Sequence, residues 1–208
     1  MSSETRSKHY FHLKGQQAEA VLHDLAYRSF FVDWCFPNPK LPNGKELCDL
    51  LVVFDSTAII VQAKSLKVGK TGLLNAKEVE KNLRQLAGAR RQLFDLKTPV
   101  ELANAHRTIE QFDPNLIREV FLVSVLLGDT PTVQAMATEV KDHQCHVFSS
   151  EFTEIVLNEL DTINDFCTRI YLLQHQSRST HEIDARCPFS SLAPATSSAV
   201  PCDPGIKR

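Results

Sequence analysis

The sequence predicts an α/β protein with a mixed β-sheet and helices on both faces of that sheet. Three stretches, 47–55, 58–64 and 119–127, are apolar at consecutive positions over the length of a strand. Such strands are covered on both faces, which is typical of α/β sheets. Stretches with apolar residues at helical spacing lie before, between and after them, so we expect helices to provide the cover. A chain of 208 residues has room for one domain with a substantial core.

Composition excludes several classes of protein. The chain is 43% hydrophobic and 23% charged, with a formal net charge of -2, which is ordinary for a soluble globular protein. Any basic surface must therefore be local, which argues against a protein that coats DNA nonspecifically. The sequence contains no recognisable secretory signal and no apolar stretch of spanning length. Its six cysteines form no CxxC pair; three disulfides are the alternative, but we expect a cytoplasmic protein with reduced thiols.

The first predicted helix runs from about residue 15 to residue 30, where apolar residues recur every three or four positions. Glu19 borders its apolar face, and an acidic side chain near a helix N-terminus is favourable in itself. The aromatic stretch Phe31–Phe36 predicts a strand. Three prolines and Gly44 follow it and predict a turn-rich loop.

Two apolar stretches, Leu47–Asp55 and Ala58–Lys64, form the predicted central hairpin. With a loop of two or four residues within 55–58, Asp49 pairs with Lys64. Because side chains alternate along a strand, Asp49, Gln62 and Lys64 then lie on one face near the open end of the hairpin. A charge on a buried strand must be compensated. Either a metal ion compensates it, or Asp49 and Lys64 form a structural ion pair, which is often no more stabilising than apolar packing.

A long helix is predicted from about Ala76 to Lys97, because its apolar residues keep helical spacing and Pro99 ends the pattern. Polar side chains on this helix and on the basic loop before it are candidates for contacts with nucleic-acid phosphates. A solvated helix face is the alternative and the commoner fate of such charges. The candidates are Lys67, Lys70, Lys81, Arg84, Gln85 and Arg91.

The C-terminal half predicts one more unit of the sheet. Glu119–Leu127 is predicted as a buried strand, Thr132–His143 as a helix and Cys145–Phe148 as a short strand, which together make a β-α-β unit with parallel strands. The segment 100–117 is left open. Ser150 is the predicted N-cap of a final helix that continues to about Gln174.

The predicted order is helix, three strands, helix, strand, helix, strand and helix. The first helix carries an acid, the second strand carries Asp49, and the third strand ends in Gln62-x-Lys64. In this order and in these residues the chain resembles the PD-(D/E)xK nuclease superfamily, the restriction-endonuclease-like fold, over about residues 14–150. It looks most similar to the branch, including some methylation-directed restriction enzymes, in which Gln replaces the acid of ExK. Cys48 stands where many members have a Pro before the Asp.

The resemblance implies a restriction-endonuclease-like mixed sheet with an αβββαβ core, a further αβ unit and a C-terminal helix. It also implies a site for Mg²⁺ or Mn²⁺ with Asp49 as the principal ligand, and Gln62 and the carbonyl of Ala63 as neutral oxygen ligands. Lys64 would orient the attacking water and stabilise charge on the phosphate. Glu19 would be a further, water-mediated metal partner. Gln62 leaves fewer negative ligands than an acid would, so a weak metal site is expected.

Two hypotheses about function follow. In the first, the protein is a divalent-metal-dependent endonuclease that acts on DNA rather than RNA, with Asp49, Gln62, Lys64 and Glu19 as its catalytic set; cutting of both strands would favour a homodimer. In the second, it is a catalytically inactive nuclease-like module that binds nucleic acid or a partner protein. A purely structural subunit, which would bind no metal, is a third alternative.

The same expectations divide the chain into three parts. Residues 1–13 are polar and are expected to form a flexible N-terminus, and residues 14–175 the nuclease-like domain. Residues 176–208 are rich in Ser and Pro and lack apolar periodicity, so a disordered tail is predicted there.

Overall fold

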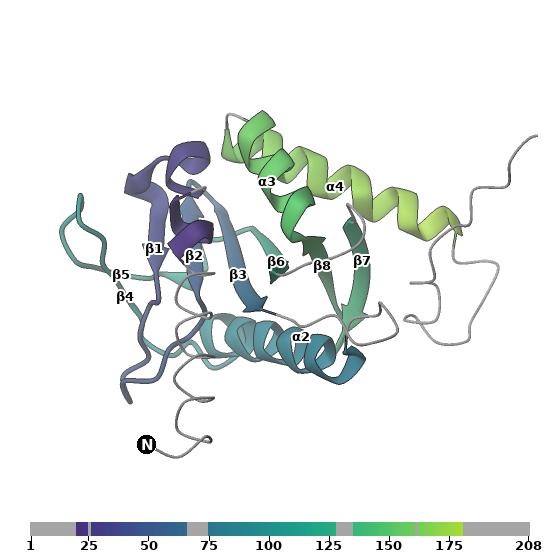
Figure 1. The fold of residues 1–208 in the computed structure, drawn as a ribbon. Coiled ribbons are helices and arrows are strands. Elements are labelled where there is room, and N and C mark those ends of the chain that lie inside the picture. Colours follow the sequence, from purple (N-terminus) through teal and green to yellow (C-terminus); the bar gives the residue numbers. More distant parts are fainter. Residues whose placement is uncertain (1–19, 25, 66–74, 128–134, 161, 181–208) are drawn as a thin grey trace, which may run out of the picture.

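The computed structural model describes residues 20–24, 26–65, 75–127, 135–160 and 162–180. Their centre is a six-stranded sheet in the order β1-β2-β3-β6-β8-β7 (Figure 1). Neighbouring strands β1, β2 and β3 are antiparallel, β3, β6 and β8 are parallel, and β7 runs antiparallel to β8. The strands are β1 (Cys35–Pro37), β2 (Leu50–Phe54), β3 (Thr57–Ser65), β6 (Glu119–Leu127), β7 (Ala135–Val140) and β8 (His143–Ser149).

The remaining elements surround this sheet. Residues 20–24 and 26–30 are helical. The other helices are α2 (Ala76–Arg90), the π-helical turn η2 (Arg91–Asp95), α3 (Ser150–Glu159) and α4 (Ile163–Thr180). The short elements are η1 (Val32–Trp34), η3 (Pro114–Leu116) and the antiparallel pair β4 (Glu101–Leu102) and β5 (Glu110–Gln111). Over the described ranges, none of the helices has the length and apolarity needed to cross a membrane.

Helices cover both faces of the sheet, as the sequence predicts. One face packs against the N-terminal helix, α3 and α4, in a core cluster that includes Val52 and Val123. The other face packs against α2, in a cluster that includes Leu51, Ile60 and Leu122. In Figure 1, α2 lies below the sheet, and α3 and α4 lie above it. The α/β class and the mixed sheet are therefore confirmed.

Helix α2 begins where the sequence predicts. The side chain of Asn75 accepts a hydrogen bond from the Lys77 N–H at 3.1 Å, which satisfies one of the free N–H groups of the first turn. Val79, Leu83 and Leu86 are buried against the sheet. This apolar face fixes how the helix is rotated, and therefore which of its polar side chains lie beside β3.

The predicted helix at Thr132–His143 is wrong, and with it the predicted further αβ unit. Within this segment, residues 135–140 form strand β7, which pairs with β8. Lys141 and Asp142 form the connecting turn, and both have positive φ angles, 51° and 62°, as tight β-hairpin turns often require. The Ala, Met and Glu residues of β7 favour helix, but pairing at the sheet edge overrides that preference. Strands β6 and β8 are nonetheless parallel, as predicted.

The predicted final helix is two helices. Leu160 has an extended backbone, with φ of -103° and ψ of 106°, which ends α3. The Thr162 hydroxyl then accepts a hydrogen bond from the Asp165 N–H at 3.0 Å and caps the start of α4. The N-cap of α3 is Ser149, whose hydroxyl accepts from Phe152 N–H at 3.2 Å. Ser150 is therefore not the cap.

The predicted strand at Phe31–Phe36 is confirmed only at its end. Val32–Trp34 forms the 3-10 turn η1, and β1 begins at Cys35. Phe31 has a positive φ of 60°, which is incompatible with a regular strand.

Candidate active site

The β2–β3 hairpin brings Asp49 level with Gln62. Leu51 pairs with Ile60 in the observed register, so Asp49, which lies one residue before β2, is opposite Gln62 when the ladder is extended. The predicted register, in which Asp49 pairs with Lys64, is therefore wrong by two residues. A shift of two residues keeps every side chain on its predicted face of the sheet.

The position of the turn sets this register. Phe54 and Thr57 are paired and flank a two-residue loop. The first loop residue, Asp55, has a positive φ of 50°, a region that Asp tolerates better than most residues. Thr57 is β-branched and joins the strand instead of the loop. The three candidate side chains of the hairpin consequently share the face that α2 covers.

Asp49 is held through both its side chain and its backbone. It is 7% exposed, and its Oδ2 accepts a hydrogen bond from the Ala63 N–H at 2.6 Å. A hydrogen bond to an ionised carboxylate is stronger than one between neutral groups. Here the Asp49 side chain serves as the acceptor, so hydrogen bonding between the two chain segments continues beyond the end of β2. The Asp49 carbonyl is 3.0 Å from the Nε2 of His23 and accepts from the Asn38 N–H at 3.0 Å.

Lys64 forms an ion pair with Glu78, an acid that sequence reasoning did not single out. The Nζ of Lys64 is 3.5 Å from a carboxylate oxygen of Glu78 in the first turn of α2, and the two side chains are 32% and 41% exposed. A partly exposed pair contributes little to stability. It does restrict where the ammonium group of Lys64 lies relative to β3.

A pocket of about 280 Å³ opens beside Asp49 and Gln62. Amide side chains and Gly88 of the α2 helix and its π-helical continuation form the opposite wall. Among the predicted nucleic-acid contacts, Gln85 lines this pocket. Asp49 and Gln62 also line the pocket, and Lys64 does not. The lining residues are Leu41, Glu46, Leu47, Cys48, Asp49, Gln62, Gln85, Gly88, Ala89 and Gln92.

Asn82 connects α2 to two neighbouring strands, β3 and β6. Its Nδ2 lies 3.2 Å from the backbone oxygen of Gln62 and 2.7 Å from the hydroxyl of Ser124 on β6, and donates to both. The side chain is fully buried. Sequence reasoning missed Asn82, although an amide beside Val79 and Leu83 on an apolar helix face was a detectable signal.

The basic candidates lie on the exposed surface of α2 and η2. Lys81, Arg84 and Arg91 are exposed, and none of them lines the pocket. Arg84 pairs with Glu80 at 3.6 Å on the same helix. Arg84 is four residues before Gly88, which lines the pocket, so the two occupy neighbouring positions on the helix surface. Three predicted site residues, Glu19, Lys67 and Lys70, lie outside the described residues.

Burial affects the ionisation of Cys48 at the pocket and of His146 elsewhere. Burial, and then the charge of Asp49, raise the pKa of the Cys48 thiol well above its usual value, while a backbone hydrogen bond from Leu50 lowers it less. Cys48 is therefore a neutral thiol and a poor nucleophile. Burial lowers the pKa of His146 on β8 to about 4, so its imidazole is neutral at pH 7.

The hairpin carries oxygen donors of the types that a hard cation binds. Among the described residues, no group of three or more His, Cys, Asp or Glu side chains is arranged to hold a metal. Mg²⁺ is commonly bound by one or two carboxylates and otherwise keeps its waters. Asp49 carries a carboxylate, and Gln62, which lines the same pocket, carries a side-chain amide oxygen. A strand residue directs its N–H and C=O toward the same neighbour, so the Ala63 carbonyl faces the Asp49 side.

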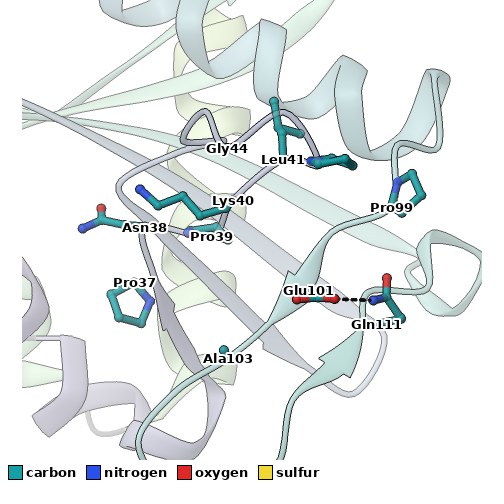
Figure 2. A pocket seen from close by; sticks show the side chains of 11 residues that line it. Pro37, Asn38, Pro39, Lys40, Leu41, Gly44, Pro99, Glu101, Ala103 and Gln111 are labelled. Carbon is teal, nitrogen blue, oxygen red and sulfur yellow. Dashed lines mark hydrogen bonds between the residues drawn. The ribbon is translucent and has the colours of Figure 1, made fainter.

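A larger pocket of about 460 Å³ lies between the loop after β1 and the segment around β4 and β5 (Figure 2). Leu41 lines both pockets. Four prolines, Pro37, Pro39, Pro42 and Pro99, form much of its surface. The Gln111 amide donates to the Glu101 carboxylate at 3.4 Å. Of the predicted site residues that the structure describes, none lines this pocket.

Comparison of the chain with protein-family models, curated proteins and solved structures found no match. Function is therefore inferred from the residues and geometry of the site.

Proposed function

We propose that the protein is a divalent-metal-dependent nuclease that hydrolyses phosphodiester bonds in DNA. One observation carries the proposal: a buried carboxylate, that of Asp49, is fixed by the Ala63 N–H at 2.6 Å in a pocket shared with Gln62. Lys64 follows on the same strand face, where its ammonium group pairs with Glu78. A carboxylate, a neutral oxygen and an ammonium group at one strand end suit the hydrolysis of an anionic ester.

The order of elements supports the proposed relation to the restriction-endonuclease-like fold. An N-terminal helix precedes the antiparallel strands β1, β2 and β3, helix α2 follows, and β6 lies parallel to β3. This is the αβββαβ order that the resemblance implies. The αβ unit expected after it is replaced by the hairpin of β7 and β8.

Each residue has a distinct role in the proposed reaction. Asp49, Gln62 and the Ala63 carbonyl would hold Mg²⁺ or Mn²⁺, which when bound supplies an acidified water and neutralises charge on the phosphate. Lys64 orients the water and stabilises negative charge on the phosphate. Glu78 keeps the Lys64 ammonium group at the strand end. Gln85 lines the pocket and would donate to a sugar or phosphate oxygen.

A second candidate function is a nuclease-like module that binds nucleic acid or a partner protein without cutting. The small number of carboxylate ligands favours this alternative. Asp49 is the only buried carboxylate among the described residues, and Gln62 stands where an acid would strengthen the metal site. On this alternative, the site binds metal too weakly to support hydrolysis.

One experiment separates the two functions. Supercoiled plasmid DNA is incubated with Mg²⁺ or Mn²⁺ and the wild type, Asp49→Ala or Lys64→Ala, while DNA binding is followed by fluorescence anisotropy. Lys77→Ala is the matched control, because Lys77 is an exposed lysine in the first turn of α2. The nuclease predicts metal-dependent cutting by the wild type and Lys77→Ala only. Intact plasmid in every case, with binding retained, favours the binding module.

A further inference from the structure

Asn82 is a buried amide on a helix face that is otherwise apolar. It is 0% exposed, and its neighbours Val79, Leu83 and Leu86 belong to the core cluster between α2 and the sheet. An apolar side chain at this position would satisfy the packing of the helix. The amide therefore has another task, which its hydrogen bonds identify.

The orientation of the Asn82 amide follows from its partners. The backbone oxygen of Gln62 only accepts hydrogen bonds, so the amide group that faces it must be the NH₂. The same Nδ2 donates to the Ser124 hydroxyl. Among the described atoms, the Asn82 Oδ1 is buried without a hydrogen-bond partner. Since this unsatisfied acceptor is unfavourable, the two hydrogen bonds of the NH₂ group are the reason for an amide here.

Asn82 and Asp49 bond to opposite sides of one peptide group. The carbonyl of Gln62 accepts from Asn82 at 3.2 Å, and the N–H of Ala63 donates to Asp49 at 2.6 Å. These two groups belong to the same peptide unit, which is planar, and in a trans peptide they point in opposite directions. These two hydrogen bonds therefore add to the pairing of β3 with β6 in holding the peptide that places the Asp49 carboxylate. A donor to the carbonyl also polarises the N–H and strengthens its bond.

We infer that Asn82 is a positioning residue for Asp49, acting through the peptide between Gln62 and Ala63. Helix α2 and Ser124 of β6 are thereby coupled to the carboxylate in the pocket. The consequence for metal binding and cutting rests on the proposed nuclease function. The coupling of Asn82 to Asp49 does not rest on that function, because it concerns hydrogen bonds within the protein.

The test uses the full 208-residue chain labelled with ¹⁵N. The readouts are the chemical shift and hydrogen exchange of the Ala63 amide by NMR, and Mn²⁺ affinity by calorimetry. Asn82→Leu removes the donor at similar volume. Leu83→Ala is the matched control, since it removes buried packing from the neighbouring helical position and leaves the hydrogen bonds. A purely structural role for Asn82 predicts the same response in both variants.

In Asn82→Leu we expect the Ala63 amide proton to move upfield and to exchange faster, and Mn²⁺ affinity to fall roughly 10- to 100-fold, as is typical when an outer-shell partner of a metal ligand is lost. In Leu83→Ala we expect the Ala63 resonance to stay in place. If Asn82→Leu does not fold, Asn82→Ala, which removes the same donor, decides, and an upfield shift is again expected. An unchanged Ala63 resonance in the folded variant, or an equal shift in Leu83→Ala, would overturn the inference.

The outcomes separate this inference from the proposed function. If the wild type cuts no DNA and binds no Mn²⁺, while Asn82→Leu still shifts the Ala63 amide, the nuclease proposal fails and the positioning role stands. If the wild type cuts DNA and the variant leaves both the Ala63 amide and the Mn²⁺ affinity unchanged, the positioning role fails and the nuclease proposal stands.

Discussion

Ala63 donates its backbone N–H to the carboxylate of Asp49 at 2.6 Å, across 14 positions of sequence. The peptide that makes this bond belongs to β3, a central strand of the sheet, so the bond attaches the carboxylate to a rigid part of the fold. Asp49 is thus presented to the pocket in a fixed position before any ligand arrives. Such preorganisation is what a site for a cation and a phosphate requires.

Removing the charge of Asp49 tests its role as the principal metal ligand. Asp49→Asn keeps an oxygen that can accept from Ala63, so we expect the free energy of unfolding to fall by only about 1 kcal/mol. Mn²⁺ affinity should fall by more than the roughly 10- to 100-fold typical of outer-shell changes. Calorimetry and urea unfolding measure the two effects. Asp33→Asn, at an exposed position, is the control. Equal Mn²⁺ affinity in all three proteins would rule out Asp49 as a ligand.

The ion pair between Lys64 and Glu78 is expected to matter for cutting more than for stability. Both side chains are partly exposed, so Glu78→Gln should change the free energy of unfolding by less than about 1 kcal/mol. The rate of plasmid cutting at saturating DNA should fall, because the Lys64 ammonium group loses its anchor. Glu80→Gln is the control, since it removes an exposed pair with Arg84 on the same helix. Identical cutting rates in the two variants would contradict this role.

We expect the burial of His146 to make the folded protein less stable in acid. Burial lowers its pKa to about 4 from 6.5, so the unfolded chain binds more protons than the folded protein between these values. Stability attributable to His146 is therefore present above pH 6.5 and is lost as pH falls toward 4, by up to about 1.4 kcal/mol per pH unit. Urea unfolding of wild type and His146→Gln from pH 7 to pH 4 measures this. A wild-type slope no steeper than that of the variant would contradict the prediction.

The N-cap of α3 distinguishes two adjacent serines. Ser149→Ala removes the acceptor of the Phe152 N–H and should lower the free energy of unfolding by about 0.5–2 kcal/mol. Ser150→Ala lies inside the helix, where Ala is the most favourable residue, and should have little effect or a slightly stabilising one. Thermal unfolding of both variants checks the difference. The reverse order of stabilities would place the cap at Ser150.

Hydrophobic pattern predicts most of this fold, because buried strands and amphipathic helices require it. The sheet strands β3 and β6 follow directly from apolar runs, and the start of α2 from apolar residues at helical spacing. What fails depends on backbone geometry. Because the loop begins at Asp55, the observed hairpin register differs from the predicted register by two residues. The turn at Lys141 and Asp142 pairs β7 with β8, although the residues of β7 favour a helix. Positive φ angles at Asp and Lys leave no clear mark in a sequence.

The candidate site was predictable in part for the same reason. Alternation along a strand placed Asp49, Gln62 and Lys64 on one face despite the wrong register, because an even shift preserves the face. Glu78 and Asn82 could not be paired with the hairpin from sequence, since their contacts depend on how α2 is rotated against β3. The phosphate-contact role of Arg84 remains a prediction, and its side chain does not line the pocket.

The most direct test of the central claim is the rate at which the wild type and Asp49→Ala cut supercoiled plasmid in Mg²⁺, with an EDTA-treated sample alongside. The loss of several kcal/mol of transition-state stabilisation corresponds to on the order of a 1000-fold slower reaction. A metal-dependent nuclease predicts cutting by the wild type, none with EDTA, and at least this reduction in Asp49→Ala. Cutting at equal rates by both proteins, or intact plasmid with the wild type at every concentration of Mg²⁺ and Mn²⁺, would contradict it.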